Sequence, residues 1–200
     1  MSKSMIKDAV TLLIITAVAG LLLGVVHGIT EEPIEQANYN TQQEAYRTVF
    51  PDASEFVDLE DFDTDEATAL VSEAGYDDSI DNCVEALDES GELLGYVIVV
   101  TDPNGYGGSI TFSVGITIDG TLNGYSITSI SETAGLGMKA KEEDFSSQFV
   151  DKATEETFTV TKTGSTSDYE IDAITGATIT SRAMTSGINA SVVYFNSLTE

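Results

Sequence analysis

The sequence has few of the residues that perform chemistry without a cofactor. Cys83 is its one cysteine, which excludes an internal disulfide, a zinc site of several thiolates and an iron–sulfur cluster held by this chain alone. Its one histidine, His27, lies at the end of an apolar N-terminal segment, so no histidine is available for a catalytic centre in the domain that follows. Any redox chemistry here therefore requires a bound cofactor.

Positive charge is also scarce. The 200 residues include 8 Lys and Arg against 34 Asp and Glu, for a formal net charge of −26. Such a chain repels nucleic acids and anionic lipid head groups, which argues against DNA or RNA binding. Its length suits one domain with an accessory segment. We expect Cys83 to be a small buried residue.

A long apolar segment without charge runs from Ala9 to Val26. As a helix it rises about 27 Å, close to the thickness of a hydrocarbon core of roughly 30 Å. A cleaved signal peptide is the alternative, but it usually has a shorter apolar part and an Ala-x-Ala-like cleavage site. Val26-His27-Gly28 fits such a site poorly, so the sequence favours an uncleaved membrane anchor.

The basic residues around this segment predict its orientation. Lys3 and Lys7 precede it, and no Lys or Arg follows until Arg47. The positive-inside rule then places the N-terminus in the cytoplasm and everything after Ile29 outside. We expect a single-pass protein of the cell (inner, cytoplasmic) membrane, in contact with its lipid through the N-terminal helix.

Three parts follow from this arrangement. Residues 1–29 form the cytoplasmic tip and anchor, residues 30–51 a partly helical stalk with Pro33 near its start, and residues 52–200 an extracytoplasmic domain. Residues 52–92 are strongly acidic and predict a solvated acidic surface.

Three aspartates in the acidic segment have the opening spacing of a calcium-binding loop: Asp61, Asp63 and Asp65. However, Glu66 stands where that loop needs glycine, and Ser72 where it needs a bidentate glutamate. The spacing therefore favours a solvated acidic surface over a calcium site.

Alternating apolar runs predict an antiparallel sheet at the centre of the domain. The runs cover residues 93–101, 110–118 and 121–130, and Asp119-Gly120 between the last two is a hairpin signal. Phe158 and Val160 indicate another short strand. A helical pattern then places Met184, Ile188, Val192 and Phe195 on one face. The predicted fold class is α+β, with a transmembrane helix followed by an antiparallel sheet flanked by helices.

Two runs stand out as candidate ligand-binding loops. Residues 172–181 read Asp-Ala-Ile-Thr-Gly-Ala-Thr-Ile-Thr-Ser, in which small residues let a ligand approach the backbone and hydroxyls precede a helix. We expect Thr180 or Ser181 to cap that helix, whose start would suit a phosphate. Residues 131–139 hold Gly135 and Gly137 around Leu136; for a generic protein this is an ordinary strand-to-helix loop before an acidic helix start at residues 142–144.

The first run resembles the flavinylation motif of the FMN-binding domain in the G subunit of Rnf-type electron-transport complexes. The C subunit of sodium-pumping NADH:quinone reductase carries the same motif. The family pattern is Asp, two variable residues, Ser or Thr, then Gly-Ala-Thr, and residues 172–178 match every specified position. In that family the final Thr is joined to the phosphate of FMN as a phosphodiester. The resemblance assigns this role to Thr178.

The second run supports the same resemblance. The family carries a Glu-Thr-Pro-Gly-Leu-Gly-like run against the flavin, and this chain has Glu-Thr-Ala-Gly-Leu-Gly at residues 132–137, with Ala134 in place of the common Pro. The substitution loosens the loop slightly without removing a functional group. A Gly-Tyr-Gly-Gly-like loop at residues 105–108 follows the family order as well. The resemblance covers about residues 93–195.

The resemblance implies a role for each site residue. Thr178 is the tether and Asp172 orients the turn or assists recognition. The phosphate seat is shaped by Thr175, Gly176, Ala177, Thr180 and Ser181. The flavin is lined by Glu132, Thr133, Gly135, Leu136 and Gly137, with Lys139 as a charge partner for an anionic reduced form. A separate Mg-dependent flavin transferase installs the cofactor from FAD.

The implied function is electron relay through covalent FMN in an Rnf-type ferredoxin:NAD oxidoreductase that couples electron transfer to sodium or proton transport. The partners are other membrane subunits of that complex, and the chain needs no catalytic centre of its own. Two alternatives remain open: the C subunit of sodium-pumping NADH:quinone reductase, and a cofactor-free, membrane-tethered binding or structural module.

Overall fold

The computed structural model describes residues 3–199; Met1, Ser2 and Glu200 lie outside the described part, as does the Lys3 side chain used above. The chain divides into two compact units, Met1–Thr41 and Gln42–Glu200, which we describe separately. The division into an anchor (residues 1–29), a stalk (residues 30–51) and an extracytoplasmic domain (residues 52–200) stays a prediction.

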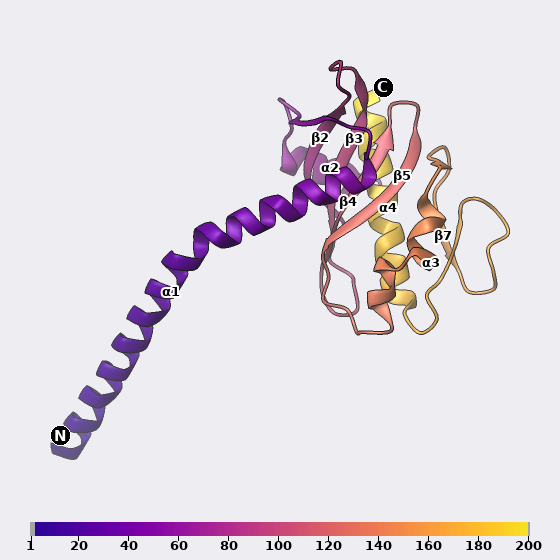
Figure 1. Cartoon of the computed structure of the whole chain (residues 1–200). Helices are drawn as coiled ribbons and strands as arrows, with labels where there is room; N and C mark the ends of the chain where they lie inside the picture. The colour runs from indigo at the N-terminus through magenta and orange to yellow at the C-terminus, as the bar shows by residue number, and fades with distance from the viewer. Residues whose placement is uncertain (1–2, 200) are drawn as a thin grey trace. The chain divides into compact units, whose positions relative to one another are not determined.

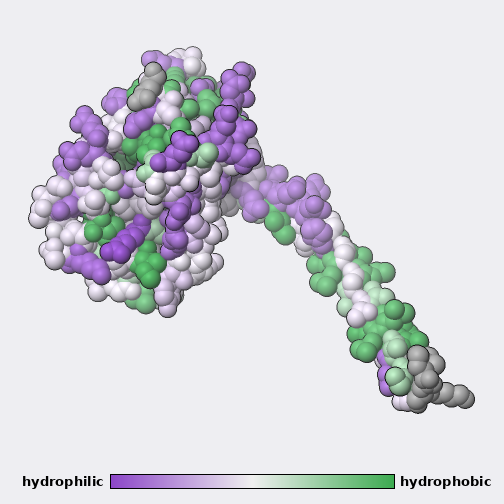
Figure 2. Space-filling model, turned by 180° about the vertical axis from the view of Figure 1, so that it is seen from behind, coloured by the Kyte–Doolittle hydropathy of each residue, from purple (hydrophilic) through white to green (hydrophobic). Residues whose placement is uncertain are grey.

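Helix α1, Lys3–Val49, makes up most of the first unit. From Lys7 onward it contains an 18-residue window of mean hydropathy 2.7, none of which is buried. Figure 2 shows hydrophobic residues gathered on the N-terminal part of this helix and hydrophilic residues after them. The helix is thus long and apolar enough to cross a membrane.

The sequence predicts a partly helical stalk at residues 30–51, and the structure has helix throughout residues 30–49. The stalk is therefore more helical than predicted. Pro33 removes one backbone hydrogen bond, but a helix of 47 residues retains the bonds on either side. The helix ends at Val49, shortly before Pro51, as the Phe50-Pro51 sequence predicts.

The second unit is built on a six-stranded antiparallel sheet in which sequence neighbours are also neighbours in space. Its strands are β1 (Glu55–Asp58), β2 (Ser79–Leu87), β3 (Leu93–Asp102), β4 (Ile110–Thr117), β5 (Thr121–Ser129) and β6 (Lys152–Ala153). Asp119-Gly120 turns the chain between β4 and β5, with Gly120 at φ +80°. The predicted antiparallel sheet is confirmed.

Helices cover both faces of this sheet. Helices α2 (Thr64–Glu73) and α4 (Thr178–Thr199) contribute to the larger core, which includes Ile98 of β3. The last turn of α1 places Tyr46 in a smaller core with Val97, the next residue of β3 facing the opposite way. Figure 1 shows α4 lying along the sheet. Because both faces are covered, β3 is a continuous apolar run. The α+β class is confirmed.

The acidic segment is more ordered than a charged surface alone requires, since it holds β1, α2 and β2. Asp63 caps α2: its Oδ1 accepts the amides of Asp65 at 2.9 Å and Glu66 at 3.0 Å. This gives the acidic spacing a structural role. Cys83 on β2 is 0% exposed, as expected, and burial raises the pKa of its thiol to about 12.

Short elements connect the sheet to the last helix. They are η1 (Gly137–Lys141), α3 (Glu143–Ser146), η2 (Ser147–Phe149), β7 (Thr159–Thr161) and β8 (Glu170–Asp172). β7 coincides with the strand predicted near residues 158–160 but pairs in parallel with β8, which the sequence did not predict. β8 ends at Asp172, so this small ladder fixes where the glycine-containing turn begins.

Candidate functional site

The turn of residues 174–177 joins β8 to α4. The Ala177 amide donates to the Ile174 carbonyl at 2.9 Å, and Gly176 between them has φ +82°. A positive φ at the third position of such a turn strongly favours glycine. Helix α4 then begins at Thr178, which places this residue in its first turn.

Ser181 holds this turn against the helix. Its buried hydroxyl accepts the Ile174 amide at 2.9 Å and donates to the Ala177 carbonyl at 3.0 Å. The expectation that Thr180 or Ser181 caps the helix is wrong, because α4 already begins at Thr178 and both residues lie inside it. Ser181 therefore positions the turn from within the fold.

The loop after β5 faces the turn from the other side. Glu132 is 8% exposed, and its Oε1 accepts the amides of Tyr106 at 2.7 Å and Gly107 at 3.3 Å. A side chain at Gly107 would collide with the Ser131 carbonyl. The loops on the two sides of the β4–β5 hairpin are thereby held together, and Glu132 connects them.

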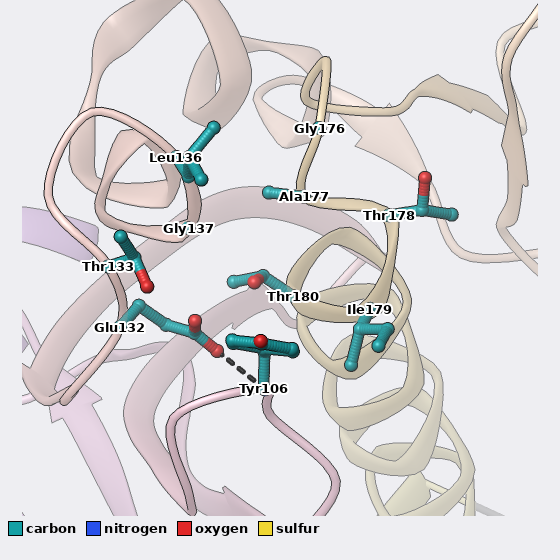
Figure 3. A pocket seen from close by; sticks show the side chains of 10 residues that line it. All are labelled: Tyr106, Glu132, Thr133, Leu136, Gly137, Gly176, Ala177, Thr178, Ile179 and Thr180. Atoms are coloured by element: carbon teal, nitrogen blue, oxygen red, sulfur yellow. Dashed lines mark hydrogen bonds between the residues drawn. The ribbon is translucent and has the colours of Figure 1, made fainter.

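A cavity of about 570 Å³ opens among these loops and the start of α4. That volume falls within the range of roughly 300–1,000 Å³ found for small-molecule sites. The cavity, drawn in Figure 3, is lined by Tyr106, Glu132, Thr133, Leu136, Gly137, Gly176, Ala177, Thr178, Ile179 and Thr180. Both runs singled out in the sequence thus contribute to one site.

The Thr180 hydroxyl is an orphaned polar group in this cavity wall. Thr180 is 0% exposed and its Oγ1 has no hydrogen-bond partner within the described chain. Gly137 packs closely against this group, since a Cβ there would lie 2.5 Å from Glu132 Oε2 and 2.6 Å from Thr180 Oγ1. A buried hydroxyl without a partner costs about 1–3 kcal/mol, so this wall is suited to a polar ligand atom.

The cavity wall has little charge. Glu132 is the one carboxylate among the ten lining residues, and none of them is Lys or Arg. A bound anion must therefore rely on the first amides of α4, which have no partner within the helix, and on its dipole. Thr178 lies at this end of the helix, as Figure 3 shows.

Some predicted site residues lie outside the cavity. Asp172, Thr175 and Lys139 line a second hollow of about 250 Å³. The backbone amide of Asp172 donates to Gln148 Oε1 at 2.7 Å. Gly135 is exposed at φ +74° and does not line the cavity. The structure therefore does not bring Lys139 or Gly135 to the cavity wall.

Two lining residues were not predicted. Tyr106 and Ile179 are 72% and 51% exposed, and both side chains border the cavity. Tyr106 could have been found, because it is the aromatic residue of the Gly-Tyr-Gly-Gly-like loop. Ile179 carried no such signal, since an apolar residue in a helix usually belongs to the core.

Comparison with known proteins agrees with this geometry. Residues 105–193 match the family model of the FMN-binding domain, and residues 1–49 match that of the RnfG N-terminal region. The G subunit of the Na(+)-translocating ferredoxin:NAD(+) oxidoreductase complex of Acetobacterium woodii is 34% identical, over 99% of this chain and 95% of that protein. The G subunit of the ion-translocating oxidoreductase complex of Methanosarcina acetivorans is 32% identical, over 96% and 95%.

A solved structure shares the fold. The crystal structure of Shewanella oneidensis NqrC matches with a TM-score of 0.50 and 20% identity, over 60% of this chain and 61% of that one. At this identity the likeness concerns the fold alone. The identities to the two G subunits extend over nearly the full length of both chains and include the N-terminal region. The chain therefore belongs to the family of G subunits of ion-translocating oxidoreductase complexes.

Proposed function

We propose that this chain relays electrons through one FMN, covalently attached to Thr178, within a membrane-bound ferredoxin:NAD oxidoreductase of the Rnf type. The observation that carries the proposal is the cavity in which Thr178, the first turn of α4 and the Glu132 loop meet. When bound, FMN supplies one- or two-electron transfer that no side chain of this sequence provides. The other subunits of the complex supply and accept the electrons.

The residues present fit such a cofactor. Thr178 presents a hydroxyl at the start of α4, where helix amides favour an anion. A phosphodiester carries one negative charge rather than the two of a free phosphate monoester, which suits a wall without Lys or Arg. The Thr180 hydroxyl offers an unused hydrogen bond beside it. Attachment through the phosphate leaves the ring system chemically unchanged.

Three partly exposed apolar side chains suit an aromatic ring system. Tyr106, Leu136 and Ile179 border the cavity and are 72%, 42% and 51% exposed. A flat ring placed among them removes apolar surface from water on both partners, which contributes roughly 25 cal/mol per Å². Such side chains also exclude water from one side of a bound flavin.

The attachment step balances without an internal base. The Thr178 oxygen forms a bond to the phosphorus on the riboflavin side of FAD, the pyrophosphate P–O bond breaks, and AMP leaves. The hydroxyl proton passes to solvent or to the transferase. Gly176 and Ala177 carry little or no side chain beside Thr178, which leaves the hydroxyl accessible to that enzyme.

Asp172 and Thr175 then serve recognition rather than flavin binding. Both are exposed and line the second hollow together with Lys139. Their place outside the cavity fits contact with the transferase during attachment. Lys139 lines the second hollow and not the cavity, so it does not serve as a charge partner of the flavin.

The chain is membrane-anchored, and we propose that its N-terminus is cytoplasmic and that everything after Ile29 lies outside. Lys3 and Lys7 precede the apolar part of the segment, and no Lys or Arg follows it until Arg47. A domain on that side has no access to cytoplasmic FMN, so a dissociable flavin would be lost. The covalent bond provides retention.

In-gel fluorescence tests the tether. The full-length chain is produced with its native flavin transferase, denatured, and separated on a gel under ultraviolet light. Wild type and Thr178→Ser should fluoresce, because both keep a hydroxyl, and Thr178→Val should not. Thr180→Val is the matched control, since it removes a hydroxyl two residues away and should stay fluorescent. A dark wild-type band would favour a cofactor-free binding module.

A C subunit of a sodium-pumping NADH:quinone reductase is the second candidate, and the shared fold with NqrC does not by itself distinguish it. Co-purification separates the two. The tagged chain, isolated from native membranes, should bring down ferredoxin-type iron–sulfur subunits if it belongs to an Rnf-type complex.

A further inference from the structure

Two carboxyl groups are buried against each other beside α4. Asp78, directly before β2, and Asp102, at the end of β3, are each 1% exposed. Their side chains lie within hydrogen-bonding reach of each other. Two ionised carboxylates in that position would repel strongly because little water screens them.

The hydrogen bonds around the pair leave one oxygen of each carboxyl group without a partner. Asp78 Oδ2 accepts the Ser186 hydroxyl at 2.7 Å, and Asp102 Oδ1 accepts the Asn104 amide at 2.6 Å. The other oxygen of each group, Asp78 Oδ1 and Asp102 Oδ2, is buried without a partner. One proton between these two oxygens satisfies both, as a carboxylic acid donating to a carboxylate.

No cation compensates the pair. Among the side chains that the structure describes, the single ion pair joins Lys152 and Asp168, so Arg182 of α4, which shares a hollow with Asp102, forms no ion pair with either carboxylate. Burial raises the pKa of both groups, that of Asp78 to about 7, and the charge of Asp77 raises the pKa of Asp102 further. Ser186 opposes this by stabilising the charged form of Asp78. The titration belongs to the pair rather than to one residue.

We propose that Asp78 and Asp102 share one proton and that this protonated pair ties the loop bearing Tyr106 to helix α4, positioning two walls of the cavity. Asp102 fixes the Asn104 amide, two residues before Tyr106. Asp78 holds Ser186, about two turns beyond Thr178 on α4. Both are positioning residues, and their effect on flavin rests on the proposed function.

The pH dependence has a definite sign. An aspartate in the unfolded chain has a pKa near 3.9, whereas the pair retains its proton up to about pH 7. The folded chain therefore binds one more proton than the unfolded chain within that interval. The stabilisation from this proton is complete below about pH 4 and is lost as the pH rises through about 7. Between these two pH values the unfolding constant should rise about tenfold per pH unit.

Urea unfolding of the full-length protein in detergent tests the pair. Wild type is compared with Asp78→Asn from about pH 5 to about pH 9. The introduced amide can donate to Asp102 Oδ2 and accept from Ser186, so it replaces the shared proton with one that does not titrate. The ratio of wild-type to variant unfolding constants should rise about 100-fold from pH 5 to pH 7 and then level off.

The matched control is Asp61→Asn, which removes one exposed carboxylate and should leave a pH-independent ratio to wild type. A constant ratio for Asp78→Asn would overturn the shared proton. If that variant does not fold, infrared spectroscopy of the wild type decides. A carbonyl band of a protonated buried carboxyl should be present near pH 6 and absent near pH 9, and its absence at both would overturn the proposal.

A flavin readout separates this inference from the proposed function. In flavin-loaded wild type the visible spectrum should shift between about pH 6 and pH 8, and in Asp78→Asn it should not. An unchanged wild-type spectrum overturns the positioning role. If the natively produced protein carries no flavin but its unfolding constant still depends on pH as described, the proposed function is contradicted and the shared proton is supported.

Discussion

Buried oxygen atoms without a partner occur at several places in this domain, and two of these places differ in their surroundings. Thr180 Oγ1 lies in the wall of a cavity of about 570 Å³, where Gly137 packs close to it. The carboxyl groups of Asp78 and Asp102, each with one unpartnered oxygen, instead lie within hydrogen-bonding reach of each other in packed surroundings. A missing partner therefore indicates a ligand in the first region and a proton in the second.

A glycine allows close packing in both regions. Gly187 of α4 lies against Asp78, where a Cβ would meet Phe112 at 2.6 Å and Asp78 Oδ1 at 3.1 Å. Its missing side chain lets the helix approach. At Gly137, the missing side chain lets the loop pack against Glu132 and Thr180, which both line the cavity.

A side chain added at Gly137 should have the largest effect on the cavity side of this comparison. In Gly137→Ala the new methyl group overlaps Glu132 Oε2 and Thr180 Oγ1, which should cost about 1–3 kcal/mol of stability and strongly reduce flavin loading. Gly135→Ala is the matched variant. Its Cβ has nothing within 4 Å, so only the strain of φ +74° remains, about 1 kcal/mol.

Urea unfolding together with the flavin content per protein checks this pair of variants. Equal flavin loading in the two variants would show that the close packing of Gly137 against Glu132 and Thr180 does not shape the cofactor site, and the cavity side of the comparison would fail.

Two neighbouring hydroxyls of α4, that of Ser181 with hydrogen-bond partners and that of Thr180 without one, can be removed separately. Ser181→Ala leaves the Ile174 amide buried without an acceptor and should cost about 1–3 kcal/mol. Thr180→Val removes a buried hydroxyl that has no partner, so the flavin-free protein should gain about 1–3 kcal/mol of stability. Denaturant unfolding measures both, and a loss of stability for Thr180→Val would mean that its hydroxyl has a partner in the flavin-free protein.

The smallest expected effect on stability comes from replacing Ser186, which donates a hydrogen bond to Asp78 of the carboxyl pair. Its hydroxyl stabilises the charged form of Asp78, so Ser186→Ala should raise the pKa of the pair, and the loss of stability with pH should move upward by about one pH unit. The unfolding series from about pH 5 to pH 9 measures this midpoint. A downward shift would contradict the hydrogen bond as described.

Local patterns predicted much of the fold, and long-range packing decided the rest. The Asp119-Gly120 hairpin and the apolar run of β3 follow from turn chemistry and from burial on both faces. The acidic composition of residues 52–92 predicts a solvated surface there, whereas in the structure β2 pairs with β3, with irregularities between Ile80 and Asn82 and between Ala86 and Leu87. The parallel pairing of β7 with β8 has no local signal at all.

The same limit applies to the site. The motif placed Thr178 and Gly176 at the cavity, and the second run placed Glu132 opposite them. Lys139 was assigned to the flavin because it is close in sequence to the cavity-lining loop, yet η1 directs it to a different hollow. Asp78 and Asp102 are separated by 24 residues, and only the packing of two strand ends against α4 brings them together.

Peptide mass spectrometry of the natively produced protein tests the central claim most directly. Trypsin cleavage after Lys162 and Arg182 releases residues 163–182, which contain Thr178. The account predicts that this peptide carries the mass of FMN less one water, with fragment ions placing the addition on Thr178. An unmodified peptide, or an addition on Thr175 or Thr180, would contradict it.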